Sequence, residues 1–204
     1  MDKYFNRYQM HWENNRILPA SFTCSFCGRK VTSDIGLPLV RYGSNGEKFC
    51  EPASGVYICI NCYRPTFIYD CKQFPAERIG KQFEGIPKNI NNLYEEARSC
   101  YSVDAYTGVI LLCRKLLMHV AIDQGAKSNK RFIDYVNYLD EEHYINVNSK
   151  HWVDRIRRLG NDANHEIIIN SEEDARTIIL FCEMLLATLY EYPGIEKKIE
   201  HKPK

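Results

Sequence analysis

The 204-residue chain lacks any long hydrophobic run free of charge. Its two most apolar stretches, residues 109–122 and 178–190, are interrupted by Arg114, Lys115 and Glu183. A membrane-spanning helix needs about 18 residues with few or no charges. The first residues are polar and aromatic and lack the apolar core of a signal peptide. We therefore predict a cytoplasmic protein without a membrane span.

An excess of charge of one sign is also absent. The chain has 27 Lys and Arg residues against 26 Asp and Glu residues, which gives a formal net charge of +1. This balance argues against a polyanion-binding surface over the whole chain, although a local basic patch is still possible. We find no internal repeat and no glycine-rich loop of the kind that cradles phosphates in nucleotide hydrolases. A composition of 45% hydrophobic and 26% charged residues predicts a globular protein.

Cysteine, in contrast, is abundant. The chain has nine cysteines, an odd number, and six of them precede residue 75. In a reducing compartment such residues are thiols or metal ligands more often than disulfides. The composition changes over residues 75–88, where two prolines and two glycines indicate a linker. We predict a zinc-ribbon domain with an N-terminal extension over residues 1–78, a helical bundle over 79–193 and a charged tail over 194–204.

Two Cys-x-x-Cys pairs, Cys24 with Cys27 and Cys59 with Cys62, predict a metal site. Four thiolates at this spacing are typical of tetrahedral Zn²⁺ sites, in which all four positions are filled and none is open for catalysis. The 31 residues between the pairs exceed the usual 15–20 or so, and we expect an added hairpin over residues 37–55. The sequence thus predicts a structural Zn²⁺ that folds a small domain.

Some assignments in this half remain open. Cys50 or Cys71 could replace one of the four ligands. The aromatic residues after the second pair could stack on bases or pack the ribbon against the second half; they are Tyr63, Phe67 and Tyr69. A second group of residues could bind nucleic acid or form an ordinary solvated surface; it consists of Arg29, Lys30, Arg41, Tyr42, Lys48 and Phe49.

Helical periodicity dominates the second half. We expect five helices with short connections, at about residues 89–101, 104–125, 132–139, 149–166 and 171–193. Asp104 and Ser171 are the expected N-caps of the second and last helices, and Pro193 with Gly194 is expected to end the last one. Such a set predicts an antiparallel bundle. The fold class expected for the whole chain is mainly α, with a small β-rich zinc ribbon before the bundle.

The fourth predicted helix has two distinct faces. Its apolar face comprises Trp152, Ile156, Leu159 and Ala163. Its opposite face carries His151, Asp154, Arg158, Asn161 and His165. A polar face of this kind is typical of any surface helix, but it could also be a catalytic face.

Four blocks of the second half resemble a known family. They are residues 86–97, 105–117, 156–166 and 171–175, of which Arg-x-Leu-Gly-Asn-x-Ala-x-His is the most specific part. Together they are similar to the uncharacterised bacterial domain family of the HEPN clan, over about residues 80–193. The resemblance implies a small helical bundle, commonly dimeric, that is found beside zinc ribbons and in phage-defence or toxin–antitoxin systems. Many HEPN domains are metal-independent endoribonucleases.

The resemblance also implies site residues. The HEPN signature is an Arg separated by four to six residues from a His, which Arg158 and His165 match. Asn161 joins them as the third catalytic candidate. The supporting candidates are His151, Asp154 and Arg157.

The implied reaction is RNA cleavage to a 2′,3′-cyclic phosphate, with His165 as general base or acid and Arg158 holding the phosphate. The partners that the resemblance implies are RNA, a second copy of the chain paired through this helix, and a defence-system protein. The residue after Arg158, commonly polar in the family, is here Leu159. This departure favours the alternative of a non-catalytic adaptor that binds nucleic acid or protein.

Overall fold

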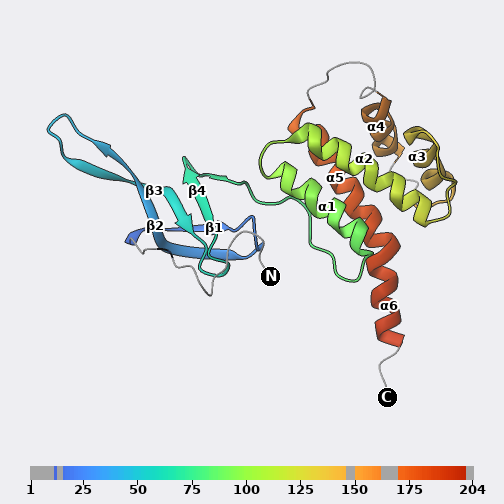
Figure 1. Ribbon diagram of the computed structural model, residues 1–204, viewed down its shortest axis with the longest axis horizontal. Helices are drawn as coiled ribbons and strands as arrows, with labels where there is room; N and C mark the ends of the chain where they lie inside the picture. Colours follow the sequence, from blue (N-terminus) through green and yellow to red (C-terminus); the bar gives the residue numbers. More distant parts are fainter. Residues whose placement is uncertain (1–11, 13–15, 146–149, 162–169, 201–204) are drawn as a thin grey trace. The chain divides into compact units, whose positions relative to one another are not determined.

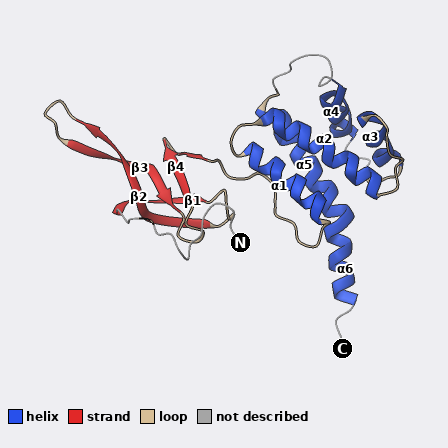
Figure 2. Ribbon diagram, in the orientation of Figure 1, coloured by secondary structure: helices blue, strands red, loops and turns tan. Residues whose placement is uncertain are grey.

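The computed structural model describes residue 12 and residues 16–145, 150–161 and 170–200 (Figure 1). The chain divides into two compact units, residues 1–78 and 79–204. Figure 2 shows that strands make up the first unit and helices the second. The expected fold class, mainly α, is therefore wrong. The protein is mixed α and β, because the first half forms a full five-stranded sheet and not only a small ribbon.

The first unit is one antiparallel sheet with its strands in chain order, β1-β2-β3-β4-β5. The strands are β1 (Arg16–Thr23), β2 (Lys30–Tyr42), β3 (Lys48–Ile58), β4 (Pro65–Tyr69) and β5 (Lys72–Phe74). Alternate residues of a strand face opposite sides of a sheet, and here one side is buried. Its core includes Phe22, Val31, Tyr57 and Ile68.

Strands β2 and β3 form the hairpin that the long spacing between the cysteine pairs predicted. Two glycines allow its strands to approach closely. A Cβ atom on Gly36 would lie 1.9 Å from the Val56 carbonyl oxygen, and one on Gly55 would lie 2.2 Å from the Leu37 carbonyl oxygen. Any other residue would force the backbones apart. The outer part of the hairpin, residues 39–51, is here called the arm.

The second unit is a helical bundle. Its helices are α1 (Lys88–Tyr101), α2 (Tyr106–Asp123), α3 (Phe132–Glu141), α4 (Lys150–Asn161), α5 (Glu172–Leu186) and α6 (Tyr192–Glu200), with a π-helical turn η3 (Ala187–Glu191) between the last two. Helix α2 packs against α1, α3 and α5. Its Leu116, Leu117 and Val120 are fully buried. The bundle therefore has a continuous apolar core that α2 supplies from the centre.

The two predicted N-caps have different outcomes. Ser171 caps α5 as expected, accepting a hydrogen bond from the Asp174 N–H at 3.1 Å. Asp104 does not cap α2, because the N-cap is Ala105 and no side-chain hydrogen bond caps the helix.

The last helix also continues past Pro193, and residues 194–200, expected in the tail, belong to α6. Proline is tolerated in the first turn of a helix. The π-helical turn η3, directly before α6, accommodates the change in backbone geometry between α5 and α6.

The long helical run formed by α5, η3 and α6 bears on the prediction that the chain has no membrane span. Residues 172–199 form a 28-residue run that includes an 18-residue stretch with a mean hydropathy of 1.4, and the run is long and apolar enough to span a membrane, by length and composition alone. The core helix of a soluble protein passes the same test, and α5 buries Ile178, Ile179 and Phe181 in the bundle. This run is weak evidence for a membrane span, and a cytoplasmic location stays a prediction.

Candidate metal centre and polar helix face

Two tight turns carry the four cysteines of the first unit. In the first turn, the Gly28 N–H donates to the Cys24 carbonyl at 2.8 Å. In the second, the Tyr63 N–H donates to the Cys59 carbonyl at the same distance. Gly28 and Tyr63 have φ angles of 69° and 60°, so that both turns use the left-handed region after the second cysteine. The two turns are thus equivalent knuckles, although only the first has the glycine that this conformation favours.

The four thiols converge on one point. The Sγ atoms of Cys24 and Cys62 are 3.6 Å apart, those of Cys27 and Cys59 are 3.8 Å apart, and all four lie within 4.8 Å of one another. A Zn–S bond of about 2.3 Å gives tetrahedron edges of about 3.8 Å. The donor set and its geometry therefore fit a metal ion such as zinc. Cys50 and Cys71 are exposed and lie outside this cluster.

The surroundings of Cys27 favour its thiolate. Burial alone would raise the pKa of this thiol, but hydrogen bonds from the Arg29 backbone, the Asn61 side chain and the neighbouring thiols lower it to about 7. The Arg29 guanidinium in turn donates to the Asn61 side-chain oxygen at 2.9 Å. Burial raises the pKa of Cys24. A bound cation would compensate for this burial by stabilising all four thiolates.

Helix α4 of the second unit is held in place by two arginines. Arg155 donates to Glu173 at 3.0 Å and to Asp174 at 2.9 Å, both at the start of α5. Arg157 donates to Asn137 and Asp140 of α3, at 2.9 and 3.2 Å.

Arg157, a supporting candidate from the sequence, therefore connects α4 to α3 through hydrogen bonds. It also donates to Asp154, another supporting candidate, at 3.0 Å.

Arg158 differs from both of these arginines. Its side chain is exposed, and within the described part of the chain it makes no ion pair or hydrogen bond. His151 and Asp154 are also exposed, which places all three on the outward side of α4. His151 contacts the Trp152 ring edge-on, with the ring centroids 6.2 Å apart.

The other two catalytic candidates cannot be placed. Asn161 is the last residue of α4, but its side chain lies outside the described residues. His165 also lies outside them. Whether the imidazole of His165 approaches the guanidinium of Arg158 thus stays a prediction.

Comparison with protein families identifies the second unit. Residues 95–202 match the model of a domain of unknown function, DUF4145. The chain belongs to the DUF4145 family. The match includes α4 and all the catalytic candidates, whereas the sheet and its cysteines lie outside it. No curated protein and no solved structure matches the chain significantly.

Some residues of the DUF4145 domain were not expected at the site. Val153 and Ile156 are fully buried. The buried side of α4 therefore includes Val153, which the predicted apolar face omitted. Arg155 was not selected either. An acidic pair at the next helix start, here Glu173 and Asp174, is the sequence signal that would have indicated its ion pairs.

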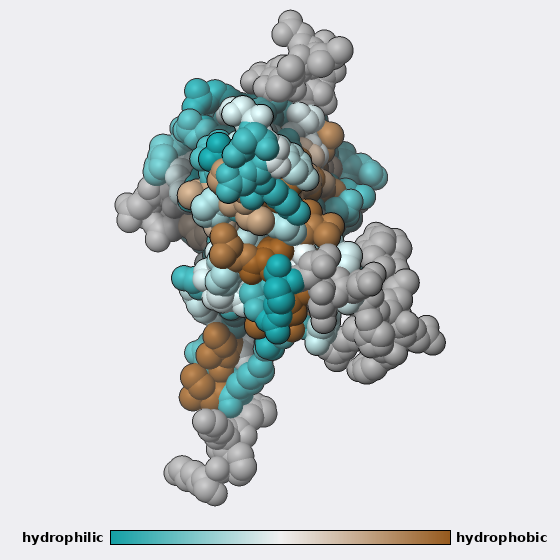
Figure 3. All heavy atoms as spheres, turned by 90° about the vertical axis from the view of Figure 1, so that its left-hand side faces the viewer, coloured by the Kyte–Doolittle hydropathy of each residue, from teal (hydrophilic) through white to brown (hydrophobic). Residues whose placement is uncertain are grey.

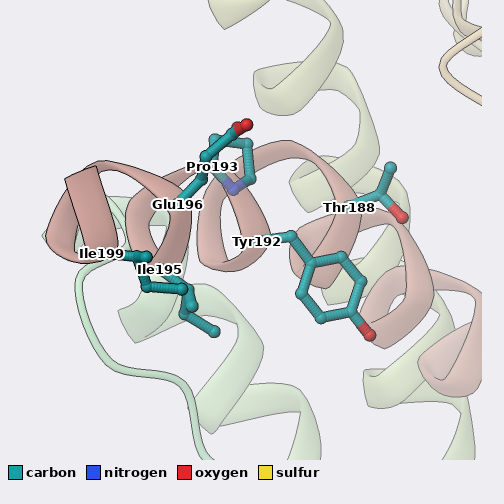
Figure 4. A pocket seen from close by; sticks show the side chains of 6 residues that line it. All are labelled: Thr188, Tyr192, Pro193, Ile195, Glu196 and Ile199. Atoms are coloured by element: carbon teal, nitrogen blue, oxygen red, sulfur yellow. The ribbon is translucent and has the colours of Figure 1, made fainter.

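A shallow hollow of the same domain lies along α6. Figure 4 shows its lining, which comprises Thr188, Tyr192, Pro193, Ile195, Glu196 and Ile199. All six residues come from one continuous helical run. In Figure 3 a hydrophobic strip lies beside a hydrophilic one on this helix. No group of polar side chains converges there, and we assign the hollow no chemistry.

Proposed function

We propose that the protein is a metal-independent endoribonuclease of the HEPN type, with a structural Zn²⁺ in its sheet unit. One observation carries this proposal. Of the three arginines on α4, two are bound to side chains of neighbouring helices, and Arg158 alone is exposed without a partner among the described residues. A guanidinium in this state is available to bind a phosphate through two parallel hydrogen bonds.

The chemistry follows from the residue types. His165 takes the proton of a ribose 2′-hydroxyl, since an unperturbed imidazole with a pKa of about 6.5 exchanges protons near neutral pH. The 2′-oxygen bonds to the adjacent phosphorus, the bond from phosphorus to the 5′-oxygen breaks, and that oxygen receives a proton. Arg158 stabilises the charge that develops on the phosphoryl oxygens. Asn161 orients the phosphate or the imidazole.

Two further parts of the proposal complete the site. A second copy of the chain, paired through α4, supplies another Arg–His set, so that one imidazole accepts a proton while the other donates one. The Zn²⁺ takes no part in the reaction, because four thiolates leave it no open coordination position. The family resemblance further suggests a role in phage defence or in a toxin system.

The test is RNA digestion by the purified full-length chain, with and without EDTA. We expect Arg158→Ala and His165→Ala to lower cleavage at least 100-fold, while the circular dichroism spectrum and zinc content stay unchanged. Lys115→Ala is the matched control, because Lys115 is an exposed basic residue on α2. It should cleave RNA as the unmodified chain does.

Two results would overturn the proposal. One is cleavage that persists in His165→Ala, and the other is cleavage that needs added Mg²⁺. An absence of RNA turnover together with a stable bound partner would instead support the adaptor alternative.

A further inference from the structure

The outward side of the sheet carries a row of apolar residues that the core does not use. In the strand register Leu37 lies opposite Val56, Val56 opposite Phe67, and Phe67 opposite Phe74. Directly opposite residues point to the same face of a sheet. These four side chains therefore form one row across β2, β3, β4 and β5. Leu37, Phe67 and Phe74 are 57%, 42% and 53% exposed.

The next pair along β4 and β5 adds a third ring and a positive charge. Tyr69 lies opposite Lys72, and both are exposed. Tyr69 is two residues from Phe67 and so faces the same side, about 7 Å along the strand. We call Phe67, Tyr69, Lys72 and Phe74 the aromatic platform.

The aromatic platform does not belong to the core of the sheet. Along β4 the intervening residues Thr66 and Ile68 are the buried ones, at 0% and 7% exposure. Scattered exposed apolar residues need no explanation, but a contiguous group of rings is typical of a binding surface. The platform is therefore free to contact another molecule.

The charge of this unit favours an anionic molecule. The described residues 16–78 include eight basic side chains and five acidic ones, an excess of three positive charges. Two of the acidic side chains, Asp34 and Glu51, already pair with Arg16 and Arg41. Rings that stack on bases, next to amines that pair with phosphates, are the combination that binds single-stranded nucleic acid.

We propose that the aromatic platform binds single-stranded RNA, with Phe67, Phe74 and Tyr69 stacking on bases and Lys72 contacting a phosphate. This inference rests on the proposed function, because RNA is the substrate class assigned to the second unit. Stacking is possible with every base, and the platform therefore adds affinity with little sequence preference. A duplex, whose bases are already stacked on each other, binds it poorly.

The experiment measures binding separately from cleavage. A labelled 20-nucleotide single-stranded RNA is titrated with the full-length chain carrying His165→Ala, and fluorescence anisotropy gives the dissociation constant. Adding Phe67→Ala or Phe74→Ala should weaken binding about 10-fold each, as loss of one base stack predicts. Lys72→Ala should reduce the slope of log affinity against log salt concentration by the equivalent of about one phosphate contact. A duplex of the same length should bind more weakly than the single strand.

Tyr192→Ala is the matched control, because Tyr192 is an aromatic residue on α6, outside the platform, and is 59% exposed. It should leave RNA affinity unchanged. Zinc content and the circular dichroism spectrum establish that each variant is folded. The proposal is overturned if the Phe67 and Phe74 variants bind RNA like the parent. It is also overturned if they change the solution mass and not the affinity, because the face would then be an interface between copies.

The two proposals fail in different ways. If His165→Ala still cleaves RNA but the platform variants lose affinity, the RNA-binding face stands without the HEPN reaction. If His165→Ala abolishes cleavage while the platform variants bind normally, the reaction stands and RNA is held elsewhere.

Discussion

The two units of the chain are stabilised in different ways. Among the residues that the structure describes, the sheet buries a cluster of eight, and two of these are the metal-site cysteines Cys24 and Cys59. The described part of the bundle buries a cluster of 27 residues. A small domain buries too little apolar surface for a stable core and commonly needs a metal or a disulfide. From this comparison we predict that the sheet depends on a metal ion held by the four thiols, whereas the bundle is stable without one.

Of the predicted changes, metal removal should cause the largest difference in stability between the two units. Zinc binding of about 10–16 kcal/mol exceeds the stability of a typical small domain. We expect Cys24→Ser, or treatment with a strong chelator, to unfold the sheet and leave the bundle helical. Limited proteolysis should then cut within residues 16–74 and spare residues 88–141. A sheet that resists protease without metal would contradict the comparison.

A core substitution in α2 should destabilise the bundle and leave the sheet unchanged, and we expect this effect to be of intermediate size. Leu116 is fully buried, and Leu116→Ala should cost about 2–5 kcal/mol of bundle stability through the cavity it leaves. Urea unfolding followed by helical circular dichroism measures this loss, and zinc content should not change. Leu111→Ala, at a 54% exposed position on the same helix, is the control and should change stability by less than about 0.5 kcal/mol.

The smallest predicted effect concerns pH and is confined to the bundle. Burial alone would raise the pKa of Asp174, but hydrogen bonds from Ser171 and Arg155 lower it below 3.8. A carboxyl group with a lowered folded-state pKa stabilises the fold above its unfolded pKa, and this contribution is lost as the pH falls through the folded value.

Asp174→Asn should therefore lower bundle stability at pH 7 by less than about 1 kcal/mol and flatten its decline below pH 3.8. Urea midpoints at pH 7 and pH 3 measure this difference. An unchanged pH dependence in the variant would show that the Asp174 carboxylate is not the group responsible.

The sequence predicted features that depend on local spacing. The two Cys-x-x-Cys pairs fixed the four thiols of the metal site, because each pair lies on one turn of backbone. Ser171 was recognised as an N-cap because capping involves residues only three apart.

Features set by distant residues were not predicted. The five-stranded sheet needs β4 and β5, which are only five and three residues long and carry little periodicity. The positive φ angle at position 63 was not predicted, because the residue there is a tyrosine and not a glycine. Continuation of the last helix past Pro193 depends on the π-turn before it.

The polar face of α4 illustrates the same limit. Periodicity placed His151, Asp154 and Arg158 on one side, and the structure exposes all three. Periodicity could not distinguish Arg157 from Arg158, because the two partners that hold Arg157 to α3 are 17 and 20 residues away in the sequence. Tertiary contacts, and not residue type, decide which arginine is available to a ligand.

The position of the arm between the two knuckles has a consequence for protein engineering. Its tip turns over residues 43–47, closed by backbone hydrogen bonds that involve none of the cysteines. Chain length can therefore vary at the tip without changing the separation of the thiols. A peptide tag or a fluorescent label inserted between Ser44 and Asn45 should therefore leave the four thiols in place and their capacity to bind a metal intact.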